Sequence, residues 1–299
     1  MKEFNNIVKK ICNELDIKLT FLSDGWVMVL EKDEKIKYIE SNRFSLNTHA
    51  IANIMNDKGL FYDLMINRNF PIIEHKVVFK NTNENEIIDF FNSNKKNIIV
   101  KGNIGMCGKE VFLINDLKIL LDKVKELLIN QYSISLCPYY DILHEYRVIV
   151  LDNEVKLIYG KTRPKIIGDG ISNLLILAKK FNNDYFSKLE NQTFDINYIP
   201  KIGEEIILNF QFNLSKGSLS FLEIDDALKN KIIDLALKVC QKTDIRFASI
   251  DIIETKSHEL LIMEANSGVT INKFINQHKD GYKIAYNIYK DAIMKMFEE

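Results

Sequence analysis

Two apolar segments near the C-terminus, joined by a polar turn, form the most informative hydrophobic pattern in the chain. Residues 247–268 read FASIDIIETKSHELLIMEANSG and predict a β-hairpin that closes through Thr255–Leu260. Side chains alternate between the two faces of a strand, so Glu264 and Asn266 point to the same side. In this register Asp251 lies directly opposite Glu264. Like charges at such a position destabilise the strand pair unless something compensates them.

Two explanations of this acidic pair remain open from the hairpin alone. The two carboxylates and the amide could hold a hard divalent cation, because such ions prefer oxygen ligands. Alternatively, the hairpin is a solvated sheet edge whose carboxylates meet lysines. The rest of the chain has to distinguish these possibilities.

Hydrophobic periodicity predicts a chain of mixed helices and strands, with no long linker between domains. Apolar residues recur at helical spacing from Phe4 to Leu15 and again over Tyr282–Phe297. The other expected helices span 51–67, 86–91, 116–128, 172–180 and 224–241. The expected strands before the C-terminal hairpin span 25–30, 35–39, 76–80, 98–100, 111–114, 133–140, 145–151, 154–159 and 205–211. The pattern therefore predicts a protein of mixed helices and strands.

Composition indicates an ordinary soluble globular protein with more than one subdomain. The chain has 299 residues and a net charge of −1, so its charge does not favour a nucleic-acid or membrane-surface partner. The cysteines are scattered without a CxxC pair, which favours reduced thiols in a cytoplasmic protein over a zinc site. The chain shows neither a signal-peptide pattern nor an apolar run of the roughly 18 residues that span a bilayer.

A second informative stretch, residues 97–111, places a lysine before three glycines. Lys101 ends a predicted strand, and the glycines are Gly102, Gly105 and Gly108. Glycines allow backbone N–H groups to approach a phosphate closely, and the lysine adds a positive charge. The loop lacks the Gly-Lys-Ser or Gly-Lys-Thr ending of a Walker A motif. A phosphate-binding loop and a flexible hairpin loop without a ligand both remain open here.

The order of short motifs along the chain resembles that of the ATP-grasp superfamily of carboxylate–amine ligases. The similarity extends from about Gly25 to the last predicted helix. It is strongest with the ATP-grasp part of cyanophycin synthetase and the glutathione-synthetase module of bifunctional glutathione enzymes. The matching motifs are Asn56-Asp57-Lys58, Asn69-Phe70-Pro71, Ile99-Val100-Lys101 with its glycine loop, His144–Val148, Arg163-Pro164 with Gly168-Asp169-Gly170, Asn213–Gly217, and Asp251 with Glu264 and Asn266.

The resemblance implies a site for ATP and one or two Mg²⁺ ions, with Mn²⁺ as an alternative metal. The implied nucleotide contacts are Lys58, Lys101, Gly102, Gly105, Gly108, Leu136, Cys137, Tyr139 and Glu145, and the implied metal ligands are Asp251, Glu264 and Asn266. The lysines would hold phosphates, and Glu145 would contact the ribose. A surface carboxylate paired with Arg147 or a lysine is the alternative for Glu145. At the adenine hinge, Pro138 removes one possible backbone donor.

The resemblance also implies catalytic and substrate-binding residues. Arg163 would stabilise the transferring phosphoryl group and contact the substrate, and Arg246 could do the same from its position before the metal strand. Asn213 and Ser215 would meet the substrate carboxylate. Structural alternatives stay open, namely a salt bridge for Arg163 and a plain turn for Asn213 and Ser215. His278, in a loop near the C-terminus, could reach the amine substrate or simply be exposed.

The implied architecture is the ATP-grasp fold, in which two α+β subdomains grip ATP, with a small N-terminal α/β region in front. We expect residues 1–50 to form this N-terminal region. Residues 51–299 would form the ATP-grasp domain, with a lid subdomain at about 95–136.

The expected activity is that of an ATP-dependent peptide or amino-acid ligase of the EC 6.3 type. It would act through an acyl phosphate and release ADP and phosphate. Its partners would be small-molecule or peptide carboxylates and amines, rather than nucleic acid or membrane, and a homodimer is an open possibility. Alternatives are a modifier of a ribosomally made peptide, a simple kinase and a non-catalytic nucleotide-binding module.

Overall fold

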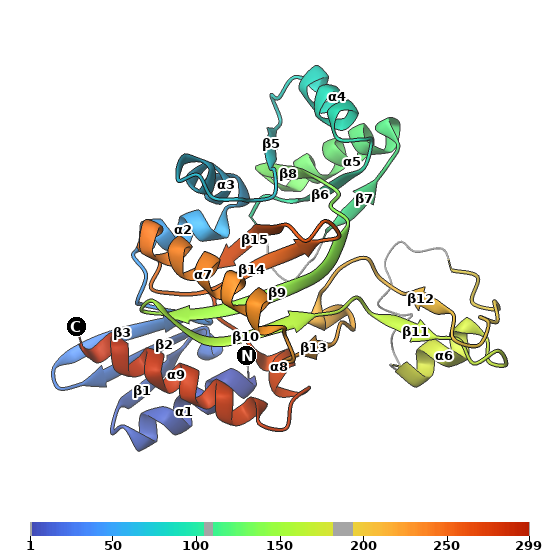
Figure 1. The fold of residues 1–299 in the computed structure, drawn as a ribbon. Helices are drawn as coiled ribbons and strands as arrows, with labels where there is room; N and C mark the ends of the chain where they lie inside the picture. The colour runs from blue at the N-terminus through green and yellow to red at the C-terminus, as the bar shows by residue number, and fades with distance from the viewer. Residues whose placement is uncertain (1, 105–109, 182–193, 299) are drawn as a thin grey trace.

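Antiparallel sheets with helices packed on them make up the fold (Figure 1). The computed structural model describes residues 2–104, 110–181 and 194–298. The mixture of helices and strands confirms the α+β class expected from the sequence. Within the described ranges, no helix combines the length and apolar character needed to cross a membrane.

A five-stranded antiparallel sheet in the order β13-β10-β9-β14-β15 forms the centre of the molecule. Its strands are β9 (Ile142–Leu151), β10 (Glu154–Lys161), β13 (Ser220–Phe221), β14 (Phe247–Thr255) and β15 (Leu260–Asn266). The predicted hairpin is confirmed, and Asp251 pairs directly with Glu264. On its other side β14 pairs with β9, which places Arg147 opposite Asp251. Asp251 therefore lies on an inner strand, between an acidic and a basic neighbour.

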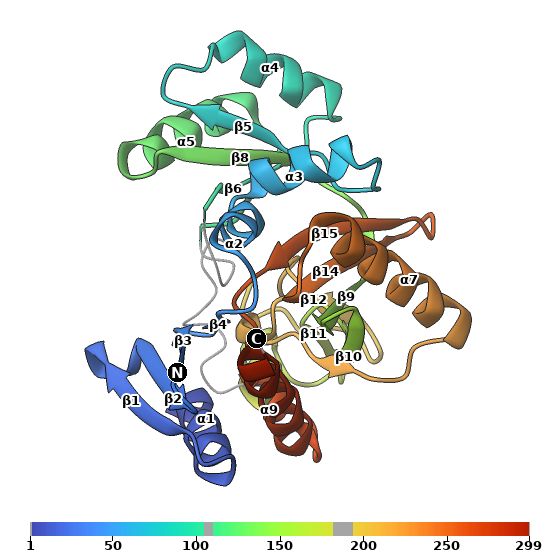
Figure 2. The ribbon, with the colours of Figure 1, turned by 90° about the vertical axis from the view of Figure 1, so that its left-hand side faces the viewer.

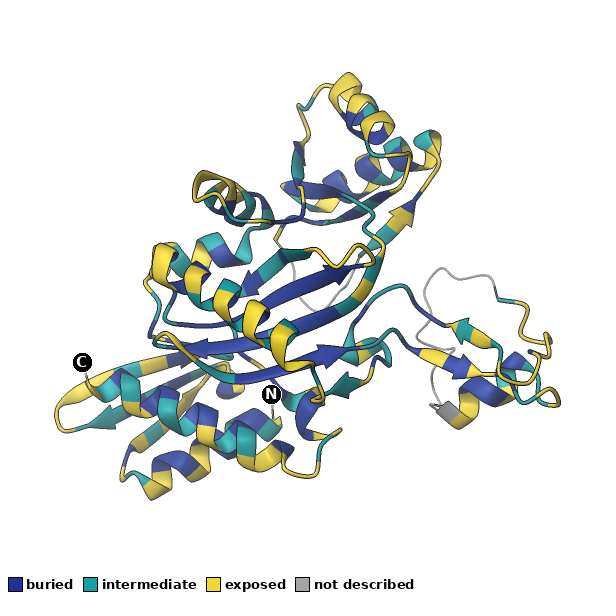
Figure 3. Ribbon diagram, in the orientation of Figure 1, coloured by how far each residue is buried: buried dark blue, intermediate teal, exposed yellow. Residues whose placement is uncertain are grey.

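The two faces of the central sheet differ in character. Apolar side chains on one face, such as Val148 and Ile250, share a core with helices α2 (His49–Asn56), α3 (Lys58–Asn67) and α7 (Asp226–Thr243). Glu145, Arg147 and Asp251 alternate with these positions and so belong to the opposite face. The central strands are largely buried (Figure 3). The charged residues of this face must consequently find partners within the protein.

The N-terminal elements share one core with the last helices of the chain (Figure 2). They are α1 (Lys2–Glu14), β1 (Lys18–Leu22), the 3₁₀ turn η1 (Ser23–Gly25), β2 (Val27–Lys32), β3 (Lys35–Glu40) and β4 (Arg43–Phe44), and the last helices are α8 (Asn272–Ile275) and α9 (Gly281–Glu298). Phe4 packs edge-to-face on Tyr289 at 4.9 Å between ring centroids, and Phe44 packs on Phe247 at 5.0 Å. The predicted strands 25–30 and 35–39 appear as β2 and β3. The short flanking strands β1 and β4 were not predicted.

Another sheet, of four strands in the order β5-β8-β6-β7, has its own core with two helices. Its elements are β5 (Lys76–Phe79), α4 (Glu84–Ser93), β6 (Ile98–Gly102), β7 (Phe112–Ile114), α5 (Leu117–Asn130) and β8 (Ser133–Pro138). We refer to residues 76–138 as the lid. This unit begins earlier than the expected 95–136, because β5 pairs with β8 and completes the sheet.

The expected single helix over 51–67 is wrong, because the chain breaks at Asp57. Asp57 adopts an extended conformation (φ −103°, ψ 113°), and its side chain accepts a hydrogen bond from the Leu60 N–H. Apolar periodicity continues across this break, which is why it suggested one helix. The break makes Lys58 the first residue of α3.

The part of the chain that connects β10 to β13 forms a small arm, at the right of Figure 1. Its elements are β11 (Lys165–Ile167), α6 (Leu174–Phe181) and β12 (Glu205–Ile207), followed by the 3₁₀ turn η3 (Leu214–Lys216). Ile166, Leu174, Leu177 and Leu208 form a separate small core. The predicted strand over 205–211 is shorter than expected, because its last residues turn toward η3.

Candidate active site

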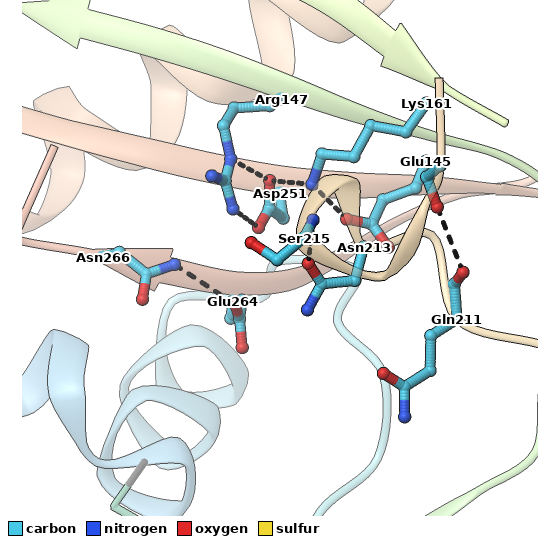
Figure 4. Close-up of polar contacts among 10 residues, drawn as sticks. Glu145, Arg147, Lys161, Gln211, Asn213, Ser215, Asp251, Glu264 and Asn266 are labelled. Atoms are coloured by element: carbon cyan, nitrogen blue, oxygen red, sulfur yellow. Dashed lines mark hydrogen bonds and ion pairs between the residues drawn. The ribbon is translucent and has the colours of Figure 1, made fainter. Parts of the chain in front are cut away.

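Four alternating charges form a connected network on the face of the central sheet opposite α2, α3 and α7 (Figure 4). Arg147 donates from Nε and Nη2 to the two Asp251 carboxylate oxygens, at 2.8 and 2.6 Å. Lys161 Nζ donates to Asp251 Oδ1 at 3.2 Å and also to Glu145. Asp251, Lys161 and Glu145 are 1%, 4% and 6% exposed. Buried charges of this kind persist when each is paired, as here.

The pKa values of the network residues depend both on burial and on the neighbouring charges. Burial opposes the charge on Asp251, yet Arg147 and Lys161 lower its pKa to about 2. Burial raises the pKa of Glu145 to about 7; the nearby Lys161 opposes this rise, and the Asp251 charge adds to it. Despite burial, the acidic partners raise the pKa of Lys161. Asp251 is therefore the carboxylate that holds the two cations in place.

Asp251 meets a lysine, as one sequence alternative expected, but this contact is buried rather than solvated and includes Arg147 as a second cation. The compensating cations come from β9 and β10, two strands that are distant in sequence from the hairpin. Lys161 was missed, because it lies two residues beyond the predicted strand 154–159, although the observed β10 extends to it. Arg147 was expected only within a motif and as a possible surface partner of Glu145, not as the partner of Asp251. Its position in a buried strand was the available signal, because a buried arginine requires an acidic partner.

Glu145 leads to a prediction about pH and stability. Its folded-state pKa of about 7 lies above the ordinary value of 4.5, so between these pH values the folded protein binds the extra proton. The free energy of unfolding should therefore fall as pH rises through this window. Relative to Glu145→Gln, wild type should lose on the order of 2 kcal/mol between pH 4.5 and 7.5. Urea unfolding of both proteins without nucleotide measures this, and a constant difference across the window would contradict it.

Glu264 and Asn266, expected as metal ligands, lie together on β15 next to Asp251. Asn266 Nδ2 donates to Glu264 Oε1 at 3.2 Å, and Glu264 is the strand partner of Asp251. In the described ranges no three His, Cys, Asp or Glu side chains are gathered as a ready-made metal cage. Mg²⁺ does not require one, because it is usually held by one or two carboxylates together with water and substrate phosphates. The oxygen donors present fit such a partial site.

Lys58 lies at the junction between β15 and the lid. A small recess is lined by Lys58, Glu264 and Asn266 together with neighbouring residues of α2, α3 and β15. Burial lowers the pKa of Lys58, Glu264 opposes this shift, and Lys101 adds to it. The structure thus brings Lys58 within electrostatic range of both Glu264 and Lys101, as a shared nucleotide site requires.

Asn103 attaches the start of the glycine loop to α3. Its Oδ1 accepts a hydrogen bond from the Gly59 N–H at 3.0 Å, and its carbonyl accepts one from Lys58 Nζ at 3.4 Å. A Cβ atom at Gly59 would lie 2.2 Å from Val77 Cγ2, so only glycine permits this close packing. At the expected contact Gly102, a Cβ would lie 2.8 Å from the flexible Gln131 side chain. Gly105 and Gly108 lie outside the described residues.

The hinge residues connect the lid to the central sheet. Leu136 and Cys137 are buried in β8, and Tyr139 donates its backbone N–H to the Asn97 carbonyl at 3.0 Å. Arg163 Nη2 donates to the Tyr139 hydroxyl at 3.3 Å, and its guanidinium lies 5.1 Å from the Phe212 ring centroid. Arg163 Nε is buried without a hydrogen-bond partner among the described residues. This Nε–H group is therefore still available to donate to a ligand. Within the described residues Arg163 forms no salt bridge.

The expected substrate loop is held as a turn. Asn213 Oδ1 accepts a hydrogen bond from the Ser215 N–H at 2.8 Å, and Ser215 itself is exposed. Gln277 Nε2 donates to the Ser218 carbonyl at 3.1 Å and so ties this loop to the segment after α8. His278, next along the chain, contacts Ser220 Oγ at 2.9 Å and stacks on Phe274. These contacts give the loop a defined position beside Lys161, because Ser220 is the strand partner of Lys161.

Arg246 is not brought to the other candidate residues. It precedes β14 at the end farthest from the hairpin turn, and it forms a bidentate ion pair with Asp152 at 2.7 and 2.9 Å. Asp152 belongs to the turn between β9 and β10. Arg246 is only five residues from Asp251 in sequence, which concealed their separation in space. Five residues along a strand span roughly 16 Å.

We therefore expect Arg246→Ala to change stability rather than turnover. Loss of a partly exposed pair should lower the free energy of unfolding by about 1 kcal/mol. The kcat and the KM for ATP should stay within about twofold of wild type. Steady-state kinetics and thermal unfolding of the same preparation measure both effects. A large loss of kcat in a fully folded variant would restore the catalytic assignment.

No family model matches the chain. Among curated proteins, it is 25% identical over 284 residues to the glutathione biosynthesis bifunctional protein GshAB of Clostridium perfringens. That alignment covers 85% of this chain and 35% of the relative, so the chain spans about a third of the relative's length.

Several solved structures share the fold. A bifunctional glutathione synthetase from Pasteurella multocida gives a TM-score of 0.58 at 13% identity, covering 97% of this chain and 44% of that one. D-alanine–D-alanine ligase from Bacillus anthracis gives 0.55 at 13% identity, covering 84% and 72%. The ATP-grasp ligase PsnB, complexed with a minimal precursor, gives 0.50 at 12% identity, covering 82% and 63%. The chain therefore has the ATP-grasp fold and resembles the ATP-grasp carboxylate–amine ligases, as its motifs predicted.

Proposed function

We propose that this chain is an ATP-dependent ligase that joins a carboxylate to an amine through an acyl phosphate. The observation that carries the proposal is the recess shared by Lys58, Glu264 and Asn266, three residues from two separate parts of the sequence. The buried network around Asp251 adjoins it through the pairing of Asp251 with Glu264. This arrangement supports a site in which cations for phosphates would lie beside oxygen donors for a magnesium ion.

The charged residues would divide the work of binding nucleotide. Lys58 and Lys101 would hold phosphates, and Glu145 would approach the ribose from β9. Glu264 and Asn266, with Asp251 opposite, would hold Mg²⁺, which when bound neutralises phosphate charge. Asp251 would also orient Arg147 and Lys161, so that their positive charges are fixed before substrate arrives.

The proposed chemistry has two displacement steps. A carboxylate oxygen of the acid attacks the γ-phosphorus of ATP, the bond to the β-phosphate oxygen breaks, and ADP leaves. The amine nitrogen then attacks the acyl carbon, phosphate leaves, and the amine proton passes to solvent or phosphate. Arg163, whose Nε has no partner among the described residues, would stabilise the negative charge of the phosphoryl group. Positioning and charge neutralisation supply most of such catalysis.

The substrate side of the site is bounded by the loop around Asn213 and Ser215. Gln277 holds this loop in place, and the arm that precedes it joins the core beside Arg163. A carboxylate-bearing substrate would approach the exposed Ser215 hydroxyl and the Arg163 guanidinium. Both a free amino acid and a peptide satisfy this requirement, so both belong in the first assays.

The decisive experiment incubates the protein with ATP, Mg²⁺ and panels of amino acids and peptides as acids and amines. The expected result is release of ADP and phosphate in step with amide formation, measured by coupled assay and mass spectrometry. A stable phosphorylated product formed without an amine would indicate a kinase instead. Nucleotide binding without turnover on any panel would favour a non-catalytic module.

A further inference from the structure

The chain crosses between the central sheet and the lid at two places, and the first crossing is anchored on the metal strand. Ile73 donates its N–H to the Ile262 carbonyl at 3.0 Å, and Ile262 donates its own to the Pro71 carbonyl at 2.9 Å. Residues 71–73 therefore run along β15. After two intervening residues the chain enters β5 of the lid. Glu74 and His75 make the connection.

His75 is the side chain that fastens this crossing to both sheets. It is 7% exposed, and its Nδ1 lies 2.6 Å from the Ser135 hydroxyl on β8. The backbone of Met263 on β15 hydrogen-bonds to the ring as well. Ser135, itself fully buried, is the strand partner of Lys101, and Met263 directly precedes Glu264. The His75 imidazole thus connects Ser135, beside the proposed phosphate ligand Lys101, with Met263, beside the proposed metal ligand Glu264.

The protonation state of the ring suits this bridging role. Burial, together with the charges of Lys101 and Lys58, lowers the pKa of His75 well below its ordinary value. A neutral imidazole has one donor and one acceptor nitrogen. Ser135 Oγ can therefore donate to Nδ1, while the other ring N–H donates to the Met263 carbonyl. Both polar atoms of the buried ring are then satisfied.

The second crossing is tied to the first. It runs from the end of β8 to the start of β9, and its Tyr140 hydroxyl accepts a hydrogen bond from the Glu74 N–H at 3.2 Å. The two covalent connections of the lid are thus joined to each other at Glu74 and to the two sheets at His75. Such a double connection restricts how the lid can tilt on the central sheet.

We propose that His75 is a positioning residue for nucleotide binding, which holds the lid strand carrying Lys101 in register with the metal strand carrying Glu264. The inference rests on the proposed function, because it assumes that phosphates bind between these strands. His75 touches neither substrate nor metal in this assignment. It acts through Ser135 and Met263 on the residues beside them.

The test measures binding of Mg²⁺ with a nonhydrolysable ATP analogue by calorimetry. His75→Leu keeps side-chain bulk but removes both hydrogen bonds, and should raise the Kd for the analogue about tenfold, the effect of one lost hydrogen bond. His75→Gln, which keeps a donor and an acceptor, should recover part of this loss. Ser135→Ala should weaken binding, and the double variant should bind no more weakly than His75→Leu. His49→Leu, at an exposed histidine on α2, is the matched control and should bind like wild type.

Kinetics and hydrogen exchange separate positioning from simple packing. In turnover assays His75→Leu should raise the KM for ATP and leave the KM values for acid and amine within twofold. Without nucleotide, β5 amides should exchange faster in His75→Leu than in His49→Leu. A lowered Tm with unchanged analogue affinity and unchanged exchange would overturn the assignment. If wild type binds no ATP analogue, the proposed function fails, and the exchange comparison still decides whether His75 fastens the lid.

Discussion

Asp251→Asn is expected to lower ligase turnover by at least about 100-fold, the largest loss among substitutions that preserve side-chain shape. The amide removes the negative charge that holds Arg147 and Lys161, and it weakens the oxygen donor opposite Glu264. The part-buried Arg147 would then lose its carboxylate partner, and the buried Lys161 would keep only Glu145. Removing one partner of a buried ion pair costs about 3–5 kcal/mol, so stability should fall as well. Steady-state kinetics under conditions where circular dichroism shows a folded variant measure the catalytic part.

Asp152→Asn provides the matched control, because Asp152 also forms a bidentate pair with an arginine. That pair is partly exposed and lies at the other end of β14. The control should keep turnover within about twofold of wild type and lose about 1 kcal/mol of stability. Equal turnover in Asp251→Asn and Asp152→Asn would show that the buried network has no part in the reaction.

Lys161→Met should combine the second large loss of activity with a loss of stability as large as that of Asp251→Asn. Methionine preserves the apolar stem of the side chain but leaves Glu145 and Asp251 with Arg147 as their only remaining cation in the network. We expect about 3–5 kcal/mol lower stability and turnover reduced at least about 100-fold. Glu145 can relieve the imbalance by taking up a proton, so the stability deficit should shrink as pH falls from 8 to 5. Urea unfolding at several pH values measures this trend.

Lys156→Met tests whether any lysine of β10 would behave in the same way. Lys156 pairs with Glu154 and Asp291 nearer the protein surface. Its loss should cost at most about 1 kcal/mol and should leave turnover and its pH dependence unchanged. A deficit for Lys161→Met that does not vary with pH would show that Glu145 stays ionised in the variant.

The sequence predicted the elements whose patterns are local. The hairpin register follows from alternation within one stretch of 22 residues, and the opposition of Asp251 and Glu264 was correct because both strands are bounded by one short polar turn. The capped helices α5 and α7 were also predictable, because periodic apolar residues follow an aspartate at each start. Family resemblance added the fold and the order of the candidate residues.

Long-range pairing set the limit of prediction. Asp251 meets Lys161 and Arg147 only because β9 lies between β10 and β14, and no local pattern specifies that order. The same limit applies to Arg246, whose proximity in sequence to the metal strand suggested a shared site that the sheet geometry does not provide. The break at Asp57 escaped detection for a different reason. A capping aspartate within a periodic apolar segment is indistinguishable from an ordinary helical residue until its neighbours are known.

The shared core of the two chain ends has a consequence for how the protein folds. The first helix packs on α9, and the Glu14 side chain accepts hydrogen bonds from Tyr286 and Lys290. During synthesis the apolar face of α1 and its sheet therefore stays uncovered until α9 is complete, when nearly 300 residues have been made. The lid, whose hydrophobic core lies within residues 76–138, can fold long before that. Folding should thus proceed from the middle of the chain outward, with closure of the termini as the late and slow step.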